Sequence, residues 1–251
     1  MNTLFIGQKV IRLSEIDSTN NYAAQQVREN GVLEGLVIIA DYQSKGKGQR
    51  SKSWESEKGK NLLCSIVLTP NFIGVSNQFI LNKAIALAVL KAAELICPAA
   101  FLRIKWPNDI LMEDKKLAGI LIESSINGSQ IGSLIVGIGM NVNQLKFEVE
   151  GRPAISISQE LGSEIPIETV LQTICKSLEV EYLKLKAGKL THIEGEYQQS
   201  LWKLNEWQQF KINGKTEMLK ILGVSEFGLL KTENEEGSLG EWRNGELEYG
   251  D

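Results

Sequence analysis

Hydrophobic and polar positions alternate between strand-like and helix-like patterns along most of the chain. Short runs rich in β-branched residues predict strands at residues 9–16, 36–43, 61–69, 101–106 and 133–143. Two further runs, at residues 110–112 and 117–126, predict a hairpin whose turn is Glu113-Asp114-Lys115-Lys116. Longer apolar segments predict helices at residues 21–29, 79–96, 155–161 and 167–186. We therefore expect an α+β unit, a sheet flanked by helices, over residues 1–200.

The segment at residues 79–96 is the most apolar part of the chain. Lys83, Lys91 and Glu94 interrupt it, so it is too polar for a membrane span. Apolar residues lie on nearly every side of the predicted helix, which indicates a helix buried against the sheet at the centre of the domain. Residues 2–16 lack a basic start followed by a sustained apolar stretch, so we expect no secretory signal.

The pattern changes near residue 200. A last helical pattern at residues 197–205 stops, and short β-like runs follow at residues 210–212, 219–224, 228–232 and 237–242. Asn213-Gly214 is the dipeptide that favours a tight hairpin turn. Residues 201–251 therefore predict a small β-barrel or sandwich appended to the larger unit.

Composition narrows the classes of protein and site. The net charge is −4 and the pI about 5.4, which argues against a general nucleic-acid binder. Cys64, Cys97 and Cys175 are widely spaced within apolar runs and are typical of reduced core cysteines in a cytoplasmic protein. His192 is the only histidine, which removes most catalytic triads and zinc sites, and we expect it on a helix surface.

A basic, glycine-punctuated segment, residues 45–54, follows the strand predicted at residues 36–43. Glycines let backbone N–H groups approach a ligand closely, and the cations Lys45, Lys47, Arg50 and Lys52 favour a polyanion such as a nucleoside triphosphate. Such a loop suits the activation of a carboxylate by ATP, in which a carboxylate and a phosphate must be held together. The alternative is a solvated basic turn.

Two common phosphate motifs do not fit this segment. Ser51 replaces the glycine that a P-loop requires before Lys52-Ser53, and no apolar-periodic helix follows. The dinucleotide fingerprint also fails, because Gly46 and Gly48 have no third glycine at the required place. The loop therefore belongs to neither class.

Several dispersed motifs occur together in one order. They are Ser18-Thr19-Asn20, Asp41-Tyr42-Gln43, the Gly46–Trp54 loop, Lys105-Trp106-Pro107-Asn108-Asp109, Lys116-Leu117-Ala118-Gly119-Ile120-Leu121 and Gly137-Ile138-Gly139-Met140-Asn141. With them the chain closely resembles the biotin–protein ligases, from about residue 14 to residue 143 and more loosely at its C-terminal β unit. The resemblance implies a class II synthetase-like mixed sheet with an SH3-like C-terminal barrel. It also implies activation of biotin by ATP and Mg²⁺ to biotinyl-5′-adenylate, and transfer to a lysine of a biotin carboxyl carrier protein.

The resemblance assigns ligand-binding residues in three groups. Polar side chains for the ureido head of biotin are Ser18, Thr19, Asn20 and Gln43. Residues along the carboxylate and the phosphates are Gly46, Lys47, Gly48, Gln49, Arg50 and Lys52, with Lys47 and Arg50 also expected in catalysis. Trp54 and Asn141 would contact the adenine, Gly119 would let the protein backbone approach the ligand, and Gly139 also belongs to the binding residues. A plain helix cap at Ser18-Thr19 and a core position for Trp54 are the alternatives.

The resemblance makes Lys116 the first choice for the cation that stabilises charge during transfer. Asn108 would help to place the metal, and Asp109 would orient or deprotonate the incoming lysine. The alternatives are a solvated lysine in a hairpin turn and a turn-forming Asn-Asp pair.

Two departures from the family qualify the resemblance. Gln49 stands where the best-studied type has arginine, and Ser51 where it has glycine. The loss of an arginine fork leads us to expect weaker retention of the adenylate, unless Lys47 or Arg50 compensates. Few residues precede the catalytic region, so we expect no operator DNA binding.

The sequence leaves alternatives open for the oligomeric state, the acceptor protein and the substrate. A homodimer through a sheet surface is plausible from the family. The acceptor among several biotin-dependent carboxylases is not specified by the sequence. A lipoate ligase of the same fold and a non-catalytic biotin or nucleotide sensor are the other candidate functions.

Overall fold

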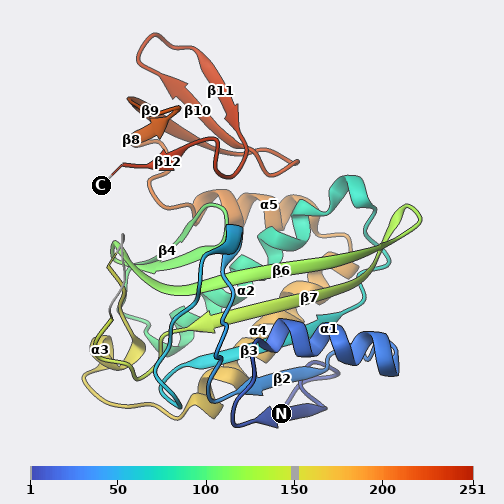
Figure 1. Ribbon diagram of the computed structural model, residues 1–251. Helices are drawn as coiled ribbons and strands as arrows, with labels where there is room; N and C mark the ends of the chain where they lie inside the picture. The colour runs from blue at the N-terminus through green and yellow to red at the C-terminus, as the bar shows by residue number, and fades with distance from the viewer. Residues whose placement is uncertain (1, 148–152, 251) are drawn as a thin grey trace.

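A seven-stranded mixed sheet forms the centre of the larger unit in the computed structural model, which describes residues 2–147 and 153–250 (Figure 1). Its strand order is β1-β2-β3-β7-β6-β5-β4. The strands are β1 (Val10–Leu13), β2 (Val37–Ala40), β3 (Leu62–Leu68), β4 (Leu102–Lys105), β5 (Asp109–Met112), β6 (Lys115–Asn127) and β7 (Gln130–Met140). Only the β1–β2 pair is parallel among these neighbours. The sheet is therefore open at β1 and β4, and its long central strands β6 and β7 supply the platform for the site.

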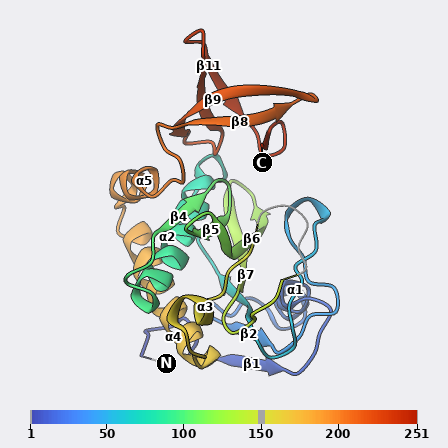
Figure 2. The same ribbon diagram turned by 90° about the vertical axis from the view of Figure 1, so that its left-hand side faces the viewer.

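Helices cover the two faces of this sheet unequally (Figure 2). One face carries α1 (Thr19–Asn30), which packs on β2, β3 and β7. The other is covered by α2 (Phe79–Ile96) and α4 (Ile167–Lys186), with α5 (Leu190–Gln199) against α2. The predicted bounds of α2 are confirmed, and its aliphatic residues from Ile80 to Ala93 are buried because it lies between the sheet and the other helices. The short elements are η1 (Gln49–Ser51), η2 (Val75–Asn77) and α3 (Ile157–Leu161).

The C-terminal part is a separate antiparallel sheet of order β11-β10-β9-β8-β12. Its strands are β8 (Trp207–Ile212), β9 (Lys215–Val224), β10 (Leu230–Asn234), β11 (Leu239–Trp242) and β12 (Glu248–Tyr249). Asn213 and Gly214 join β8 to β9 with φ of 50° and 78°, the left-handed pair that a tight hairpin turn requires. The predicted fold class, a helix-flanked mixed sheet with a small SH3-like unit, is confirmed. We propose residue 200, directly after α5, as the boundary between the two units.

The small unit is anchored to the large one through α2 and α5. Lys83 of α2 is fully buried and donates hydrogen bonds to Glu194 of α5 and to the Ser225 carbonyl beyond β9. The Trp106 indole donates to the Gly228 carbonyl at 3.0 Å. Gln198 both donates to the Val224 carbonyl and accepts its N–H, at 2.7 and 3.2 Å. These contacts hold one end of the small sheet above the edge of the large one.

Three local predictions need correction. Lys115 and Lys116 belong to β6 and not to a turn, because Glu113 adopts a φ of 54° and reverses the chain within two residues. The last helical pattern was predicted at residues 197–205, whereas α5 spans Leu190–Gln199; its start carries no side-chain cap that the sequence pattern would mark. Ser18 is the N-cap residue of α1, but its side chain makes no cap hydrogen bond.

The predicted settings of the cysteines and the histidine are confirmed. Cys64, Cys97 and Cys175 are free and buried, and burial raises the pKa of the Cys97 thiol to about 11. His192 lies on α5 with its side chain exposed. In residues 2–147 and 153–250, no helix combines the length and apolar character that a membrane crossing requires.

Candidate functional site

A cavity lies on the face of the large sheet that carries α1 and the basic loop. It encloses about 480 Å³ of space between protein atoms, a volume that includes open solvent at its mouth. Residues from six separate segments line it: Ser18, Thr19, Asn20, Gln43, Lys47, Gly48, Gln49, Trp54, Cys64, Asn108, Lys116, Gly119, Ile120, Leu121, Gly137, Ile138 and Gly139. The structure therefore brings together twelve of the seventeen residues to which the sequence analysis assigns a role in the site.

One end of the cavity is a buried hydrogen-bond network at the start of α1. The Thr19 amide donates to Gln43 Oε1 at 2.7 Å, and the Thr19 hydroxyl lies 3.0 Å from the same oxygen. Ser65 on β3, fully buried, places its hydroxyl 2.7 Å from Thr19 Oγ1 and 2.6 Å from Asn20 Oδ1. Each hydroxyl has one proton, so the Thr19 hydroxyl donates to Gln43 Oε1 and the Ser65 proton is shared between Thr19 Oγ1 and Asn20 Oδ1. The network thus fixes which way the Gln43 and Asn20 amides point.

Asn20 is also held through its side-chain nitrogen. Its Nδ2 donates to Glu123 Oε2 at 2.7 Å and to the Leu121 carbonyl at 3.4 Å, both on β6. Gly137 on β7 makes room for it, because a Cβ at that position would lie 2.4 Å from Asn20 Oδ1. The pairing of Ser65 with Gly137 across β3 and β7 brings both residues beneath Asn20.

The basic loop is a narrow hairpin closed at its neck. The Trp54 amide donates to the Gly46 carbonyl at 2.9 Å, and the Gly48 amide donates to the Lys52 carbonyl at 2.7 Å. Gly46 is required there, since a Cβ would lie 2.4 Å from the Trp54 carbonyl oxygen. Lys47 Nζ donates to Asn21 Oδ1 at 2.5 Å, which ties the loop to α1.

Asn21 also binds an acidic residue, Asp17, just before α1. Asn21 Nδ2 donates to Asp17 Oδ2 at 2.5 Å. This hydrogen bond lowers the pKa of Asp17 below its ordinary value, and the positive charge of Lys47 acts in the same direction. Asp17 and Asn21 therefore hold the Lys47 ammonium at the mouth of the cavity.

Trp54 covers the floor formed by β6 and β7. A Cβ on Gly139 would lie 2.5 Å from its ring, and one on Gly119 would lie 3.0 Å from it, so both glycines are needed for this approach. Lys116 Nζ lies 5.4 Å from the centre of the indole ring. In the described part of the chain, the buried Trp54 Nε1 meets no hydrogen-bond acceptor. The ring thus rests on the sheet at the cavity wall.

Lys116 and Asp109 form the charged part of the floor. Lys116 Nζ lies 2.8 Å from Asp109 Oδ1, with the two side chains 32% and 18% exposed. The strands β5 and β6 place them on one face of the sheet, together with Gly119, which pairs with Asp109. Asn108 Nδ2 donates to the Ile120 carbonyl at 2.6 Å, so its oxygen is oriented away from β6. A cation and a carboxylate are therefore in contact here, and Asn108 lines the same cavity.

Five of the predicted residues lie outside the cavity lining. Asn141 is buried and donates to the carbonyls of Lys116 and Ile155 at 3.2 and 3.1 Å. Arg50 turns toward the C-terminal unit, where its guanidinium donates to the Asn244 carbonyl. Gly46 forms the loop neck, Lys52 lies exposed on the loop, and Asp109 is in contact with the lining through Lys116.

Sequence reasoning missed Ser65 and Cys64 at this site, and it gave no role to Ile120, Leu121, Gly137 and Ile138, which stand within the quoted motifs. Ser65 offers a signal, because it is the one hydroxyl residue within the apolar run of β3. A polar side chain in a strand buried along its whole length needs partners on a neighbouring element. That signal indicates a buried contact, although not its partners.

The metal-ligating side chains near the cavity indicate how the implied magnesium ion would be held. Among the described residues, no group of three or more His, Cys, Asp or Glu side chains is arranged to hold a metal. Mg²⁺ binds oxygen ligands and often takes most of them from substrate phosphates and water. The oxygen of Asn108 fits a Mg²⁺ ion that arrives with a nucleotide, and does not by itself form a resident metal site.

Comparisons with known proteins agree on one family. The model of the biotin/lipoate A/B protein ligase family matches residues 13–141. The chain is 32% identical over 242 residues to the bifunctional ligase/repressor BirA of Bacillus spizizenii, covering 94% of this chain and 73% of that protein. It is 35% identical over 167 residues to the biotin–[acetyl-CoA-carboxylase] ligase of Paracoccus denitrificans, covering 64% of this chain and 68% of that protein.

A solved structure extends the likeness to both units. The biotin protein ligase of Aquifex aeolicus in complex with biotin and ATP matches with a TM-score of 0.79 and 29% identity, over 97% of this chain and 99% of that chain. The family model alone covers half of the chain, and the matched region contains the cavity residues described above. The chain therefore belongs to the biotin/lipoate A/B protein ligase family and, within it, to the biotin protein ligases.

Proposed function

We propose that this protein activates biotin with ATP and transfers it to a lysine of a biotin carboxyl carrier domain. In the first step a biotin carboxylate oxygen bonds to the α-phosphorus of ATP, and the bond to the leaving pyrophosphate breaks. In the second step the acceptor amine attacks the acyl carbon, AMP leaves and the amine loses a proton. The observation that carries the proposal is the Lys116–Asp109 pair, 2.8 Å apart, beside a cavity that ends in a buried polar network.

The polar end suits the ureido group of biotin. Thr19 already occupies Gln43 Oε1, so the Gln43 Nε2 donor is turned toward other partners. The side chain of Ser18 is buried and makes no cap hydrogen bond, which leaves it for a ligand. A neutral ligand with both donors and acceptors matches these hydroxyl and amide groups, whereas a charged head group does not. We assign this end to the head of biotin.

The charged floor suits the reacting groups. Two anions, a carboxylate and a phosphate, must approach each other, and the developing charge needs a preorganised cation. Lys116 is placed for that role, because Asp109 and the underlying strands fix its Nζ. Lys47, held by Asn21, lies at the cavity mouth and adds positive charge along the phosphates. Mg²⁺ bound with the nucleotide would neutralise further phosphate charge, with Asn108 as its protein oxygen.

Asp109 and Trp54 receive the remaining roles. In the second step Asp109 accepts the proton of the acceptor amine, once the adenylate engages Lys116 in its place. The indole of Trp54 offers a flat face for the adenine, stacked over the glycines of β6 and β7. Asn141, whose amide holds the Lys116 and Ile155 backbone, shapes the floor from below.

The partner and the compartment follow from this chemistry. The acceptor is a carboxylase carrier domain that presents one lysine at the cavity mouth. The free, buried cysteines favour the cytoplasm, where thiols stay reduced. A homodimer through a sheet surface stays a prediction.

Pyrophosphate exchange into ATP tests the proposal directly. The protein is assayed with Mg²⁺ and labelled pyrophosphate in the presence of biotin, of lipoate, or of no acid. Exchange that depends on biotin is the expected result. Exchange with lipoate alone would assign the lipoate substrate instead. Biotin binding without any exchange would identify a sensor and overturn the ligase proposal.

A further inference from the structure

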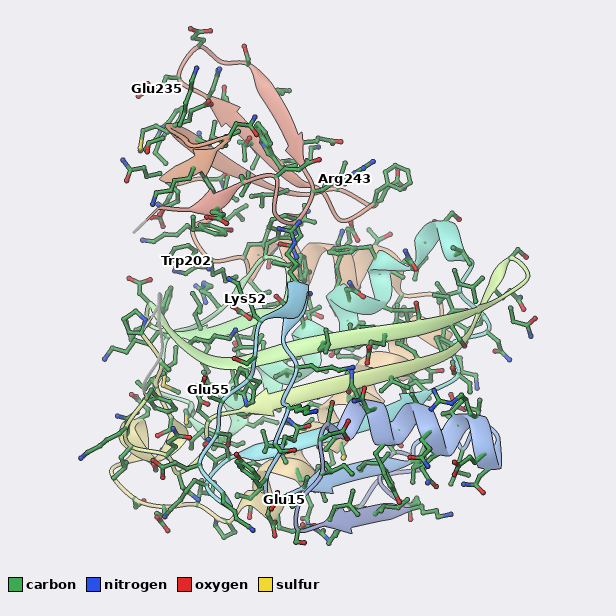
Figure 3. All side chains as sticks on the ribbon, in the orientation of Figure 1. Glu15, Lys52, Glu55, Trp202, Glu235 and Arg243 are labelled. Atoms are coloured by element: carbon green, nitrogen blue, oxygen red, sulfur yellow. The ribbon has the colours of Figure 1, made fainter. Side chains whose placement is uncertain are left out.

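The basic loop touches the C-terminal unit at one turn, between β11 and β12. Figure 3 shows the loop that carries Lys52 rising toward the turn that carries Arg243. Asn244 Nδ2 donates to Gln49 Oε1 at 2.6 Å, and the Arg50 guanidinium donates to the Asn244 carbonyl. One residue of the small unit therefore contacts two consecutive residues of the loop through its side chain and its backbone. The loop is thus bound at its tip by the small unit and at its neck by its own hydrogen bonds.

The turn is shaped to receive the arginine. Gly245 has a φ of 89°, and a Cβ at this position would lie 1.1 Å from Arg50 Nη1. The guanidinium therefore lies flat against a backbone that only glycine leaves open. Arg50 itself has φ and ψ of 54° and 48°, a left-handed conformation that a non-glycine residue holds only when its surroundings stabilise it. The contact with the turn supplies that stabilisation.

The turn is held by its own hydrogen bonds within the small unit. The Arg243 amide donates to Glu246 Oε2 at 2.7 Å, and the Glu246 amide donates to the Arg243 carbonyl at 3.0 Å. Leu247 is buried beside it, and the unit is fixed to α2 and α5 through Lys83 and Gln198. The turn is therefore a fixed support, and the loop is the partner that adapts to it.

From these contacts we propose that Asn244 is a positioning residue that latches the adenylate loop in its closed form. The Asn244 amide holds Gln49, which lines the cavity, and so keeps the loop over the bound intermediate and slows its release. Gln49 stands where an arginine occurs in the family's best-studied type. In this chain the loop is therefore held by a neutral hydrogen bond between the Gln49 and Asn244 amides, and not by an arginine at position 49. The role in retaining the intermediate rests on the proposed function. The latch itself rests only on the contacts between the loop and the turn.

Two variants separate the side-chain latch from general damage. Asn244→Ala removes the amide and keeps the backbone carbonyl that Arg50 uses, and Asn244 is not among the residues with positive φ, so alanine fits its backbone. Asn244→Asp restores the contact, because the Gln49 amide can turn its Nε2 toward the carboxylate. Glu235→Ala, on the turn between β10 and β11, is the matched control.

The first measurement uses the protein without substrates. Trypsin cleaves after lysine and arginine, so cleavage after Lys47, Arg50 and Lys52 reports opening of the loop. Loss of one net hydrogen bond predicts cleavage about fivefold faster in Asn244→Ala. The Asp variant and the Glu235→Ala control are expected to match the native chain. Equal cleavage rates in all four proteins would overturn the latch.

The second measurement follows release of biotinyl-adenylate from preloaded protein by filtration. We expect release about fivefold faster in Asn244→Ala, with the KM for biotin unchanged, since the polar end of the cavity is untouched. Unchanged release with faster cleavage would overturn the role in retention. If no protein forms an adenylate, the proposed function fails, while the cleavage rates still decide the latch.

Discussion

Lys116 provides the sharpest test of the proposed chemistry. Its Nζ lies beside Gly119, where a Cβ would be 3.4 Å away, and 2.8 Å from Asp109. Replacing it with glutamine keeps most of the side-chain volume and removes the positive charge. Loss of one preorganised group that stabilises developing charge costs about 10²–10³ in rate, or about 3–4 kcal/mol. We therefore expect biotin-dependent pyrophosphate exchange to fall by about that factor in Lys116→Gln.

The effect on stability is expected to be small, so that the two effects can be separated. The Lys116–Asp109 pair is partly exposed, and such pairs contribute about 1 kcal/mol or less. For a chain of this size that corresponds to a shift in Tm of about 2–4 °C at most. Biotin binding, measured by calorimetry, should stay within a few-fold of the native value.

Lys115→Gln is the matched control for this variant. Lys115 is the preceding residue of β6, lies exposed, and alternates to the other face of the strand. We expect its exchange rate to equal that of the native protein. An undiminished rate in Lys116→Gln, or an equal loss in both variants, would refute the assignment of Lys116.

Three further predictions concern other parts of the molecule. Ser65→Ala leaves Asn20 Oδ1 without its buried donor and should raise the KM for biotin about tenfold with little change in kcat, as steady-state kinetics would reveal; an unchanged KM contradicts the network. Gly139→Ala places a Cβ 2.5 Å from the Trp54 ring, so the ring must move; quenching of Trp54 fluorescence by acrylamide should increase, and unaltered quenching opposes the packing described. Burial alone would raise the pKa of Glu196, but Lys91, Lys184 and His192 outweigh it and lower the pKa. The stability that Glu196 contributes is therefore present above its unfolded pKa and lost as the pH falls through the folded one. The Tm should drop below about pH 4.5, and less so in Glu196→Gln; an equal drop in both proteins would remove Glu196 as a cause.

Local pattern predicted the elements that carry strong periodicity. The helix α2 was predicted with its observed bounds because its apolar run is long. The hairpin between β5 and β6 was placed correctly but its turn was drawn too long, since nothing in the sequence marks Glu113 as left-handed. The bounds of α5 were wrong, with a helical pattern drawn at residues 197–205, because the helix is polar, contains Gly195 and is stabilised by contacts with α2.

The sequence predicted the parts of the site in which several lining residues belong to one motif. The motifs around Ser18, Gln43 and Lys116 each include residues that line the cavity. Ser65 and the role of Gly137 were not predicted, because only the register of β3 with β7 brings them beneath Asn20. The contact between Gln49 and Asn244 joins residues 195 positions apart, and only the docking of the small unit creates it. Long-range pairing and docking are therefore the parts that this sequence alone does not reveal.

Intact-mass spectrometry of an acceptor protein tests the central claim most directly. An isolated biotin carboxyl carrier domain is incubated with this protein, biotin, ATP and Mg²⁺, beside a carrier whose acceptor lysine is replaced by arginine. We predict that the native carrier gains the mass of one biotinyl group and that the arginine carrier gains none. A native carrier of unchanged mass, under conditions in which the protein forms adenylate, would contradict the account.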